Sequence, residues 1–258
     1  MYSFDPHIAE LYDQIENYMD DVGLIRTLMG DKKKFYILEP FCGTGRICIP
    51  LAQAGHRVVG IDQSRPMLDR ARVKIKELSV EIPHRIDLIQ ADVMNSDWPG
   101  GFDLVILGGN CFYEFGTAEE QERCIDLASK AVLPGGYIYV DNNHMEGDLD
   151  PSWYKPGIRS SFPTGTCEDG TVIMSTSEPL WHDAPMRLIK ELRRTKIVFP
   201  TGDLVHEEYV RQTHPVSTLE VQSWLGKYGF EIRGHYGDRS SNPYTPASTR
   251  SIFWGQKV

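Results

Sequence analysis

The sequence predicts an α/β fold in which a mostly parallel sheet is interrupted by an antiparallel cap. Short apolar runs alternate with helix-like stretches between Phe35 and Asn142, and two long strand-like runs without a helix between them follow His144. The helix-and-strand pattern then returns at Ser217. Alternating strands and helices are typical of a parallel sheet covered on both faces, whereas consecutive strands joined by a tight turn form antiparallel hairpins.

Five apolar runs are the predicted strands of the first half. Each has four or five residues rich in β-branched, leucine or aromatic side chains, too short for a helix and too uniformly apolar for a half-exposed strand. The runs are 35–38, 57–61, 86–90, 103–107 and 137–140, and the helical stretches between them are 46–54, 66–78 and 118–132. Pro134-Gly135-Gly136 is expected to end the last of these helices.

The second half predicts the cap and the return to the main domain. Strand-like runs occupy 171–175, 187–199 and 203–212, and Pro200-Thr201-Gly202 between the last two indicates a hairpin. Ser217 and Glu220 form a predicted capping box at the start of a helix over 217–228, followed by strands at 230–236 and 251–255. We therefore expect a helical segment at 1–34, a core at 35–145 and 216–258, and a cap at 146–215.

Composition restricts the class of partner. The chain has 258 residues, with 36 Asp and Glu against 27 Lys and Arg, a formal net charge of −9. This balance disfavours nucleic acid, which requires a basic face, and favours cationic substrates. No signal sequence and no apolar run near the roughly 18 residues of a membrane span are present, and the five scattered cysteines show no zinc-type spacing. We expect a cytoplasmic protein without a metal.

The first predicted strand ends in a glycine-bearing loop that contains Gly43, Thr44 and Gly45. Such a loop is either a tight turn or a place where a ligand approaches the backbone. A dinucleotide-binding loop would have a third glycine where Cys48 stands. Glu39, before the glycines, would repel a pyrophosphate and suits a cationic amino group. The loop therefore predicts a nucleoside that carries an amino acid.

Two further acids stand at the ends of the second and third predicted strands. Asp62 is placed to accept both hydroxyls of a ribose, although a helix-capping role is an alternative. Asp92 is placed to accept from the amino group of adenine. Because carboxyl ends of neighbouring parallel strands meet at one edge of a sheet, three acids at three successive strand ends predict a binding site there.

These motifs, with Phe102-Asp103-Leu104-Val105-Ile106 and Leu133-Pro134-Gly135-Gly136, resemble the ordered motif series of class I S-adenosylmethionine-dependent methyltransferases. The resemblance implies a Rossmann-like seven-stranded sheet with only the last strand antiparallel, and S-adenosyl-L-methionine as cofactor. It also implies that Gly43 and Gly45, with Thr44 between them, flank the methionine part. Asp62 and Gln63 would hold the ribose, Met67 would pack near adenine, and Asp92 with the Val93 amide would bind the adenine edge.

A narrower similarity connects the stretches 107–112 and 139–144 to glycine and sarcosine N-methyltransferases. It implies that Asn110 faces cofactor and substrate, and that Tyr12 closes over the methionine carboxylate; a helix-packing role for Tyr12 is the alternative. Asn143 stands where that family has an arginine for the substrate carboxylate, so glycine is not the expected acceptor. Arg159, Arg211 and Arg239 are candidates to substitute for that arginine.

We therefore expect methyl transfer to a small molecule, with a nitrogen nucleophile as acceptor. His144 is the candidate base or substrate anchor, with a surface histidine as the alternative, and Asn143, Arg211 and Tyr244 are candidate substrate contacts. A small-molecule O-methyltransferase, an RNA or protein methyltransferase and a non-catalytic cofactor-binding protein remain alternatives. No nucleic acid or membrane partner is expected, and a homo-oligomer through the cap is left open.

Overall fold

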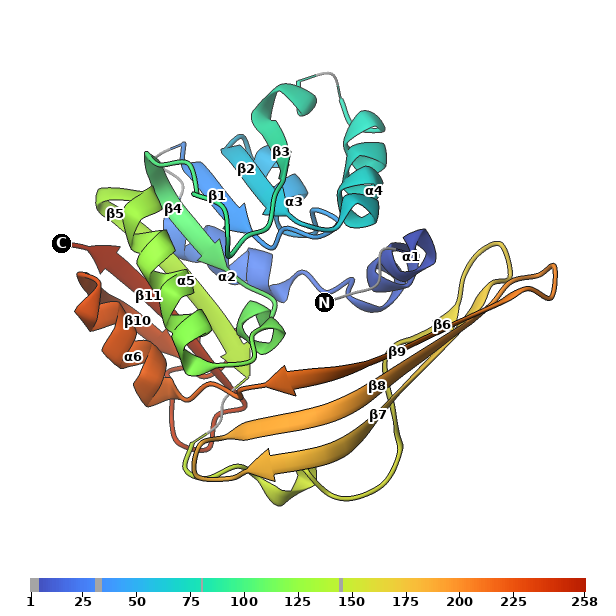
Figure 1. Cartoon of the computed structure of the whole chain (residues 1–258). Coiled ribbons are helices and arrows are strands. Elements are labelled where there is room, and N and C mark those ends of the chain that lie inside the picture. The colour runs from blue at the N-terminus through green and yellow to red at the C-terminus, as the bar shows by residue number, and fades with distance from the viewer. Residues whose placement is uncertain (1–4, 31–33, 80, 144–145) are drawn as a thin grey trace.

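Two separate sheets organise the chain (Figure 1). The structure is a computed structural model that describes residues 5–30, 34–79, 81–143 and 146–258. The strands of the first sheet are β1 (Tyr36–Pro40), β2 (Arg57–Asp62), β3 (Ile86–Gln90), β4 (Phe102–Leu107), β5 (Val132–Asn143), β10 (Phe230–Tyr236) and β11 (Arg250–Lys257). Their order is β10-β11-β5-β4-β1-β2-β3. Only β11 runs against its neighbours, so the predicted fold class is confirmed.

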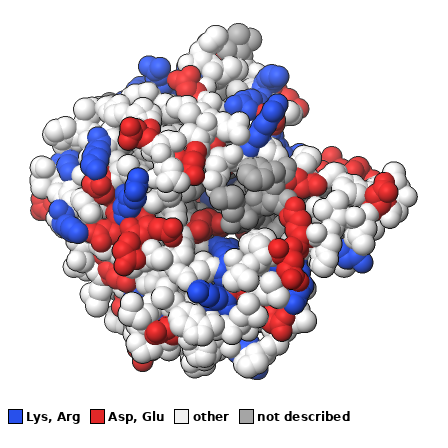
Figure 2. All heavy atoms as spheres, in the orientation of Figure 1, with Lys and Arg blue, Asp and Glu red and all other residues white. Residues whose placement is uncertain are grey.

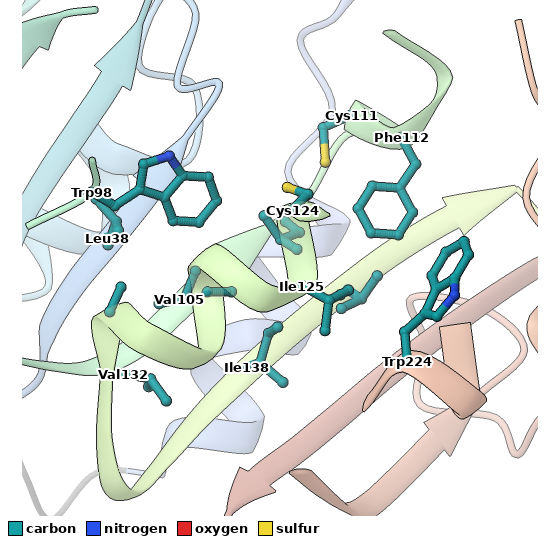
Figure 3. Packing of buried hydrophobic residues seen from close by; sticks show 14 of the residues in the cluster. Leu38, Trp98, Val105, Cys111, Phe112, Cys124, Ile125, Val132, Ile138 and Trp224 are labelled. Atoms are coloured by element: carbon teal, nitrogen blue, oxygen red, sulfur yellow. The ribbon is translucent and has the colours of Figure 1, made fainter. Parts of the chain in front are cut away.

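Helices cover both faces of this sheet. The helices of the described residues are α1 (Pro6–Ile15), α2 (Asp20–Met29), α3 (Cys48–Gln53), α4 (Arg65–Lys76), α5 (Ala118–Ala131) and α6 (Thr218–Lys227), with single 3₁₀ turns η1 (Pro83–Arg85), η2 (Cys111–Glu114) and η3 (Pro151–Trp153). On one face, Ile125 of α5 and Trp224 of α6 pack against Val105 and Ile138 (Figure 3). On the other face, α2, α3 and α4 cover the sheet. Burial of these apolar stripes holds the strand ends of the core in place.

The end of α5 differs from the prediction. The helix ends at Ala131, before Pro134-Gly135-Gly136, and those residues lie within β5. Val132 already pairs with Phe102, and a register shift follows before Tyr137 pairs with Leu104. The glycines therefore accommodate an irregularity in the strand and do not stop the helix.

The second sheet is the antiparallel cap, formed by β6 (Arg159–Thr166), β7 (Val172–Asp183), β8 (Leu188–Val198) and β9 (Leu204–Thr213) in that order. The predicted hairpin between the last two strands is confirmed. The sequence analysis missed β6 and the second half of β7. Both contain proline and register shifts, which weaken the sequence pattern of a strand without preventing pairing.

Helix α1 bridges the two sheets. Ile8 and Leu11 of α1 are almost fully buried against Met67 of α4 and against Ile173 and Ile197 of the cap. In Figure 1 this helix lies between the core and the long end of the cap sheet. The N-terminal segment therefore connects the core to the cap. Among the described residues, no helix has the length and apolar character needed to cross a membrane.

Removing the N-cap of α6 tests this description of the fold. Ser217 Oγ accepts a hydrogen bond from the Glu220 amide at 3.1 Å, and Glu220 Oε2 accepts from the Ser217 amide at 2.8 Å, so the predicted capping box is confirmed. We expect Ser217→Ala to lower the free energy of unfolding by about 1 kcal/mol, measured by urea denaturation. The exposed Ser240→Ala is the control, and an equal effect of both substitutions would contradict the role of the cap.

Candidate active site

A cavity of about 870 Å³ lies where the carboxyl ends of the parallel strands face α1 and the cap. Figure 2 shows this face hollowed, with acidic side chains on both sides of the hollow. Most of the predicted site residues line the cavity: Tyr12, Glu39, Gly43, Asp62, Gln63, Met67, Asp92, Val93, Asn110, Asn143 and Arg211. The structure thus brings together residues from all three predicted segments of the chain.

The glycine loop forms one wall of the cavity. Gly43 has a φ of +52° and open space where a side chain would project, so the backbone there is accessible to a ligand. Thr44 and Gly45 do not line the cavity. Thr44 is fully buried and its hydroxyl donates to Asp13 of α1 at 2.5 Å, and a Cβ on Gly45 would lie 3.1 Å from the Ile49 side chain. These two residues shape the loop and attach it to α1.

Glu39 is a buried acid on the cavity wall, only 5% exposed. Burial is the main cause that raises the pKa of its carboxyl group to about 8. Oε2 accepts from the Cys48 thiol at 2.7 Å, and no Lys, Arg or His within the described ranges forms an ion pair with this carboxylate. The site is therefore suited to an incoming cation, such as an ammonium group.

Arg46 also lines the cavity, and the sequence analysis did not identify it as a site residue. Its guanidinium binds both carboxylate oxygens of the buried Asp21, at 2.8 and 2.6 Å, and lies 4.0 Å from the ring of Tyr18. The arginine is thus held in a fixed orientation. With Glu39 it offers one acidic and one basic group to the same cavity, a donor set that fits the zwitterionic end of an amino acid.

Asp62 is held by the backbone at the end of β2. Its two carboxylate oxygens accept from the amides of Gly43 and Ser64, each at 2.8 Å. Burial raises the pKa of this carboxyl group, while these backbone hydrogen bonds oppose the rise. Each oxygen keeps a further lone pair for a ligand hydroxyl. Because the carboxylate is fixed and lines the cavity, its position fits the predicted ribose contact.

The side predicted for adenine is more open. Asp92 accepts from the amides of Met94 and Asn95 and from Asn95 Nδ2 at 2.9 Å, and the Asn95 side chain contributes most to lowering the pKa of this acid. Val93 is buried, and its carbonyl accepts from the Trp98 indole at 2.8 Å. This turn holds Val93 and Asp92 at the cavity wall beside the buried Met67.

The acceptor side differs from the prediction in several places. Tyr244 does not line the cavity; its ring stacks on His235 at 4.0 Å, which in turn stacks on Phe253. His144 lies outside the described residues. Of the three arginines considered as replacements at position 143, Arg211 lines the cavity. Arg159 instead binds backbone carbonyls of the cap, and Arg239 binds the acids Asp20 and Asp141.

The cap and η2 supply residues that the sequence analysis did not select. Tyr113, Trp153, Phe162, Glu191 and Arg193 line the cavity. Tyr113 and Trp153 stack with ring centroids 5.7 Å apart, and Phe162 meets Tyr12 edge-on at 6.1 Å. These aromatic pairs add apolar surface to the cavity lining.

The cavity lining is acidic. It contains seven acids (Glu16, Glu39, Asp62, Asp92, Glu114, Glu120 and Glu191) and three arginines (Arg46, Arg193 and Arg211). Each arginine has an acidic partner. Arg46 pairs with Asp21, Arg193 with Glu191 at 3.0 Å and Arg211 with Glu114 at 3.6 Å. The field in the cavity therefore attracts cations and repels anions.

Comparisons with known proteins show which proteins this chain is similar to. Residues 37–136 match a methyltransferase domain. The cypemycin N-terminal methyltransferase of a Streptomyces species is 25% identical over 260 residues, covering 96% of this chain and 95% of that protein. The glycine/sarcosine N-methyltransferase of Halorhodospira halochloris is 25% identical, covering 78% of this chain and 68% of the relative. The structure of the CcbJ methyltransferase from Streptomyces caelestis has a TM-score of 0.70 at 18% identity, with full coverage of both chains.

The order of the seven-stranded sheet, the matched methyltransferase domain and the methyltransferase relatives support a class I S-adenosylmethionine-dependent methyltransferase. It is an enzyme whose cofactor is S-adenosylmethionine. The family and the cofactor predicted from the sequence are confirmed.

Removing the Asp62 carboxylate tests the predicted ribose contact. Asp62→Ala leaves two ribose hydroxyls without a charged hydrogen-bond acceptor, which costs about 1.5–3 kcal/mol of binding free energy. We expect calorimetry to show S-adenosylmethionine affinity at least tenfold weaker. Asp87→Ala is the matched control, because Asp87 is an exposed acid on β3 whose carboxylate lies 3.5 Å from the guanidinium of Arg57 on β2. Unchanged affinity in Asp62→Ala would show that the ribose lies elsewhere.

The pKa of Glu39 predicts a pH dependence of cofactor binding. With a pKa of about 8 in the free protein, Glu39 is mostly neutral at pH 6 and mostly ionised at pH 9. A bound cation favours the ionised form, so affinity for S-adenosylmethionine should rise with pH up to about 8. Calorimetry at several pH values measures this rise. Glu39→Gln should bind more weakly and lose this part of the pH dependence; an identical profile would contradict the assignment.

Proposed function

We propose that the enzyme methylates a nitrogen of a small molecule. The observation that carries this proposal is the excess of acids in the cavity lining, with all three lining arginines paired to carboxylates. An amine arrives in water mostly as a cation, and an acidic cavity concentrates it. The names of the relatives, one an N-terminal methyltransferase and one a glycine/sarcosine N-methyltransferase, agree with a nitrogen acceptor.

The residues on the cofactor side have separate tasks in this proposal. Glu39 receives the ammonium group and Arg46, with Tyr12 beside it, receives the carboxylate of the methionine part. Asp62 and Gln63 bind the ribose, and Met67, Asp92 and Val93 form the adenine site. When bound there, S-adenosylmethionine supplies an activated methyl group. The protein's own contribution is then to position the nucleophile and to exclude water.

The cap segment 146–215 determines the acceptor in this proposal. Its strands β8 and β9 contribute Glu191, Arg193 and Arg211 to the cavity, and its first turn contributes Trp153. Asn143 brings no positive charge to the site, and Arg211 already faces Glu114. On the cap side of the cavity a free carboxylate therefore meets only Arg193 and Arg211, each of which already pairs with a glutamate that lines the same cavity, and this disfavours glycine itself. The proposal requires no nucleic-acid or membrane partner and no homo-oligomer formed through the cap.

An amine must lose a proton before or during the transfer. His144 is retained as the sequence-based candidate for that base, and Asn110 as a residue beside the reacting groups. The carboxylates of the lining provide alternative proton acceptors within the same cavity.

A competition assay tests the nitrogen acceptor. The enzyme is offered glycine, sarcosine, a neutral N-heterocycle and a catechol in one mixture with S-adenosylmethionine, and the methylated products are identified by mass. We expect a methylated nitrogen on the heterocycle and little product from glycine. Methylated catechol as the main product would overturn the proposal and favour an O-methyltransferase. A preference for glycine would show that Arg211 binds a carboxylate despite its pairing with Glu114.

A further inference from the structure

The side chain of Asn110 has a fixed orientation in the wall of the cavity. Asn110 follows β4, lines the cavity and has a left-handed backbone with a φ of 59°, which asparagine tolerates better than most residues. Its backbone amide donates to the carbonyl of Asp141 at 3.2 Å. The residue is therefore anchored to the end of β5 by its backbone as well as by its side chain.

Two donors bind the amide oxygen of Asn110. The backbone amide of Asn143 donates to Oδ1 at 2.8 Å, and Arg250 donates to the same atom from Nη2 at 3.0 Å. Neither group can accept a hydrogen bond, so the atom that they share must be the oxygen of the carboxamide. In the described part of the chain, no group accepts a hydrogen bond from Nδ2. The nitrogen, with its two N–H donors, is the end of the side chain left for a ligand.

Arg250 is itself held rigidly. Its Nε donates to Asp141 Oδ1 at 2.7 Å and its Nη1 donates to Asn143 Oδ1 at 2.9 Å. Asp141 is fully buried and also accepts from Arg239. The planar guanidinium thus connects three oxygen atoms in one geometry, which a lysine could not reproduce. Arg250 acts through Asn110 and is a positioning residue.

We propose that the acceptor is an α-amino carbonyl compound of the amide type, whose carbonyl oxygen accepts a hydrogen bond from Asn110 Nδ2 while its amine faces the methyl donor. This proposal rests on the proposed nitrogen acceptor. An N–H donor next to the reacting nitrogen favours a substrate that has a carbonyl oxygen there, because a carbonyl oxygen only accepts hydrogen bonds. The acidic lining, with its arginines paired, favours a neutral amide over a carboxylate.

The test compares alaninamide, alanine and 2-aminobutane, which share an amine on a methyl-bearing carbon. Because these amines differ in basicity, the measured quantity is the ratio of kcat/KM for alaninamide to that for 2-aminobutane, in wild type and in each variant. Asn110→Asp keeps the oxygen that Arg250 binds and replaces the N–H donor by an acceptor. Arg250→Lys keeps the charge and loses the planar contacts. Arg233→Lys, at an exposed arginine on β10, is the matched control.

We expect the ratio to fall about tenfold in Asn110→Asp and Arg250→Lys and to stay within about twofold in Arg233→Lys. Wild type should methylate alaninamide faster than alanine. Calorimetric binding of S-adenosylmethionine verifies that each variant is folded. If Arg250→Lys does not fold, the result for Asn110→Asp alone decides the proposal. An unchanged ratio with all amines still methylated would overturn this proposal and leave the nitrogen acceptor standing. Methylation of a catechol and of none of the amines would overturn both.

Discussion

A fully buried carboxylate, that of Asp141, is the constraint on which the site depends. It has no exposed surface, and it accepts from Arg239 at 2.9 Å, from Arg250 at 2.7 Å and from the Tyr139 hydroxyl at 3.2 Å. A buried charge without partners costs several kcal/mol, roughly 3–5 when one partner of a pair is removed. The two arginines must therefore approach the end of β5. Arg250 is on β11, and Arg239 lies in the loop that precedes it.

Ion pairs and cation–π contacts connect Asp141 to two residues of the cavity lining. Arg239 also contacts Asp20 at the start of α2. The ring of Tyr18 lies between two arginines, with its centre 4.3 Å from the guanidinium of Arg239 and 4.0 Å from that of Arg46. Arg46 lines the cavity, and Arg250 orients Asn110, which lines it as well. A single ionic network thus supports both of these lining residues, which couples their placement to the packing of α2 and β11.

The sequence predicted the part of the cavity lining at the strand ends better than the part from β5, β11 and the cap, for physical reasons. Glu39, Asp62 and Asp92 follow successive strands, and parallel topology alone brings such residues to one edge. The contact between Arg250 and Asn143 depends on the antiparallel register of β5 and β11, where these residues are paired. No local pattern encodes that register. Arg46 directly follows Gly45 in the predicted cofactor loop, so its place in the lining was predictable, but the sequence analysis assigns it only to a helix.

The cap was predictable as a hairpin but not as a wall of the site. Along β8, alternation places Glu191 and Arg193 on the same face as the buried Ile189 and Ile197. Which parts of that face border a cavity depends on how the cap docks against α1 and the core. That docking is set by side-chain packing among Ile8, Leu11 and Met67, for which the sequence shows only separate apolar residues.

The position of β11 has a consequence for the order in which the molecule is completed. This strand inserts between β5 and β10, although it follows both along the chain. Until it does, Asp141 lacks Arg250, and Asn110 lacks one of the two donors that orient its amide. Without this strand, β10 has no neighbour in the central sheet and the cavity lining lacks a fully oriented Asn110. The orientation of one side chain in the cavity lining thus depends on the insertion of a single strand.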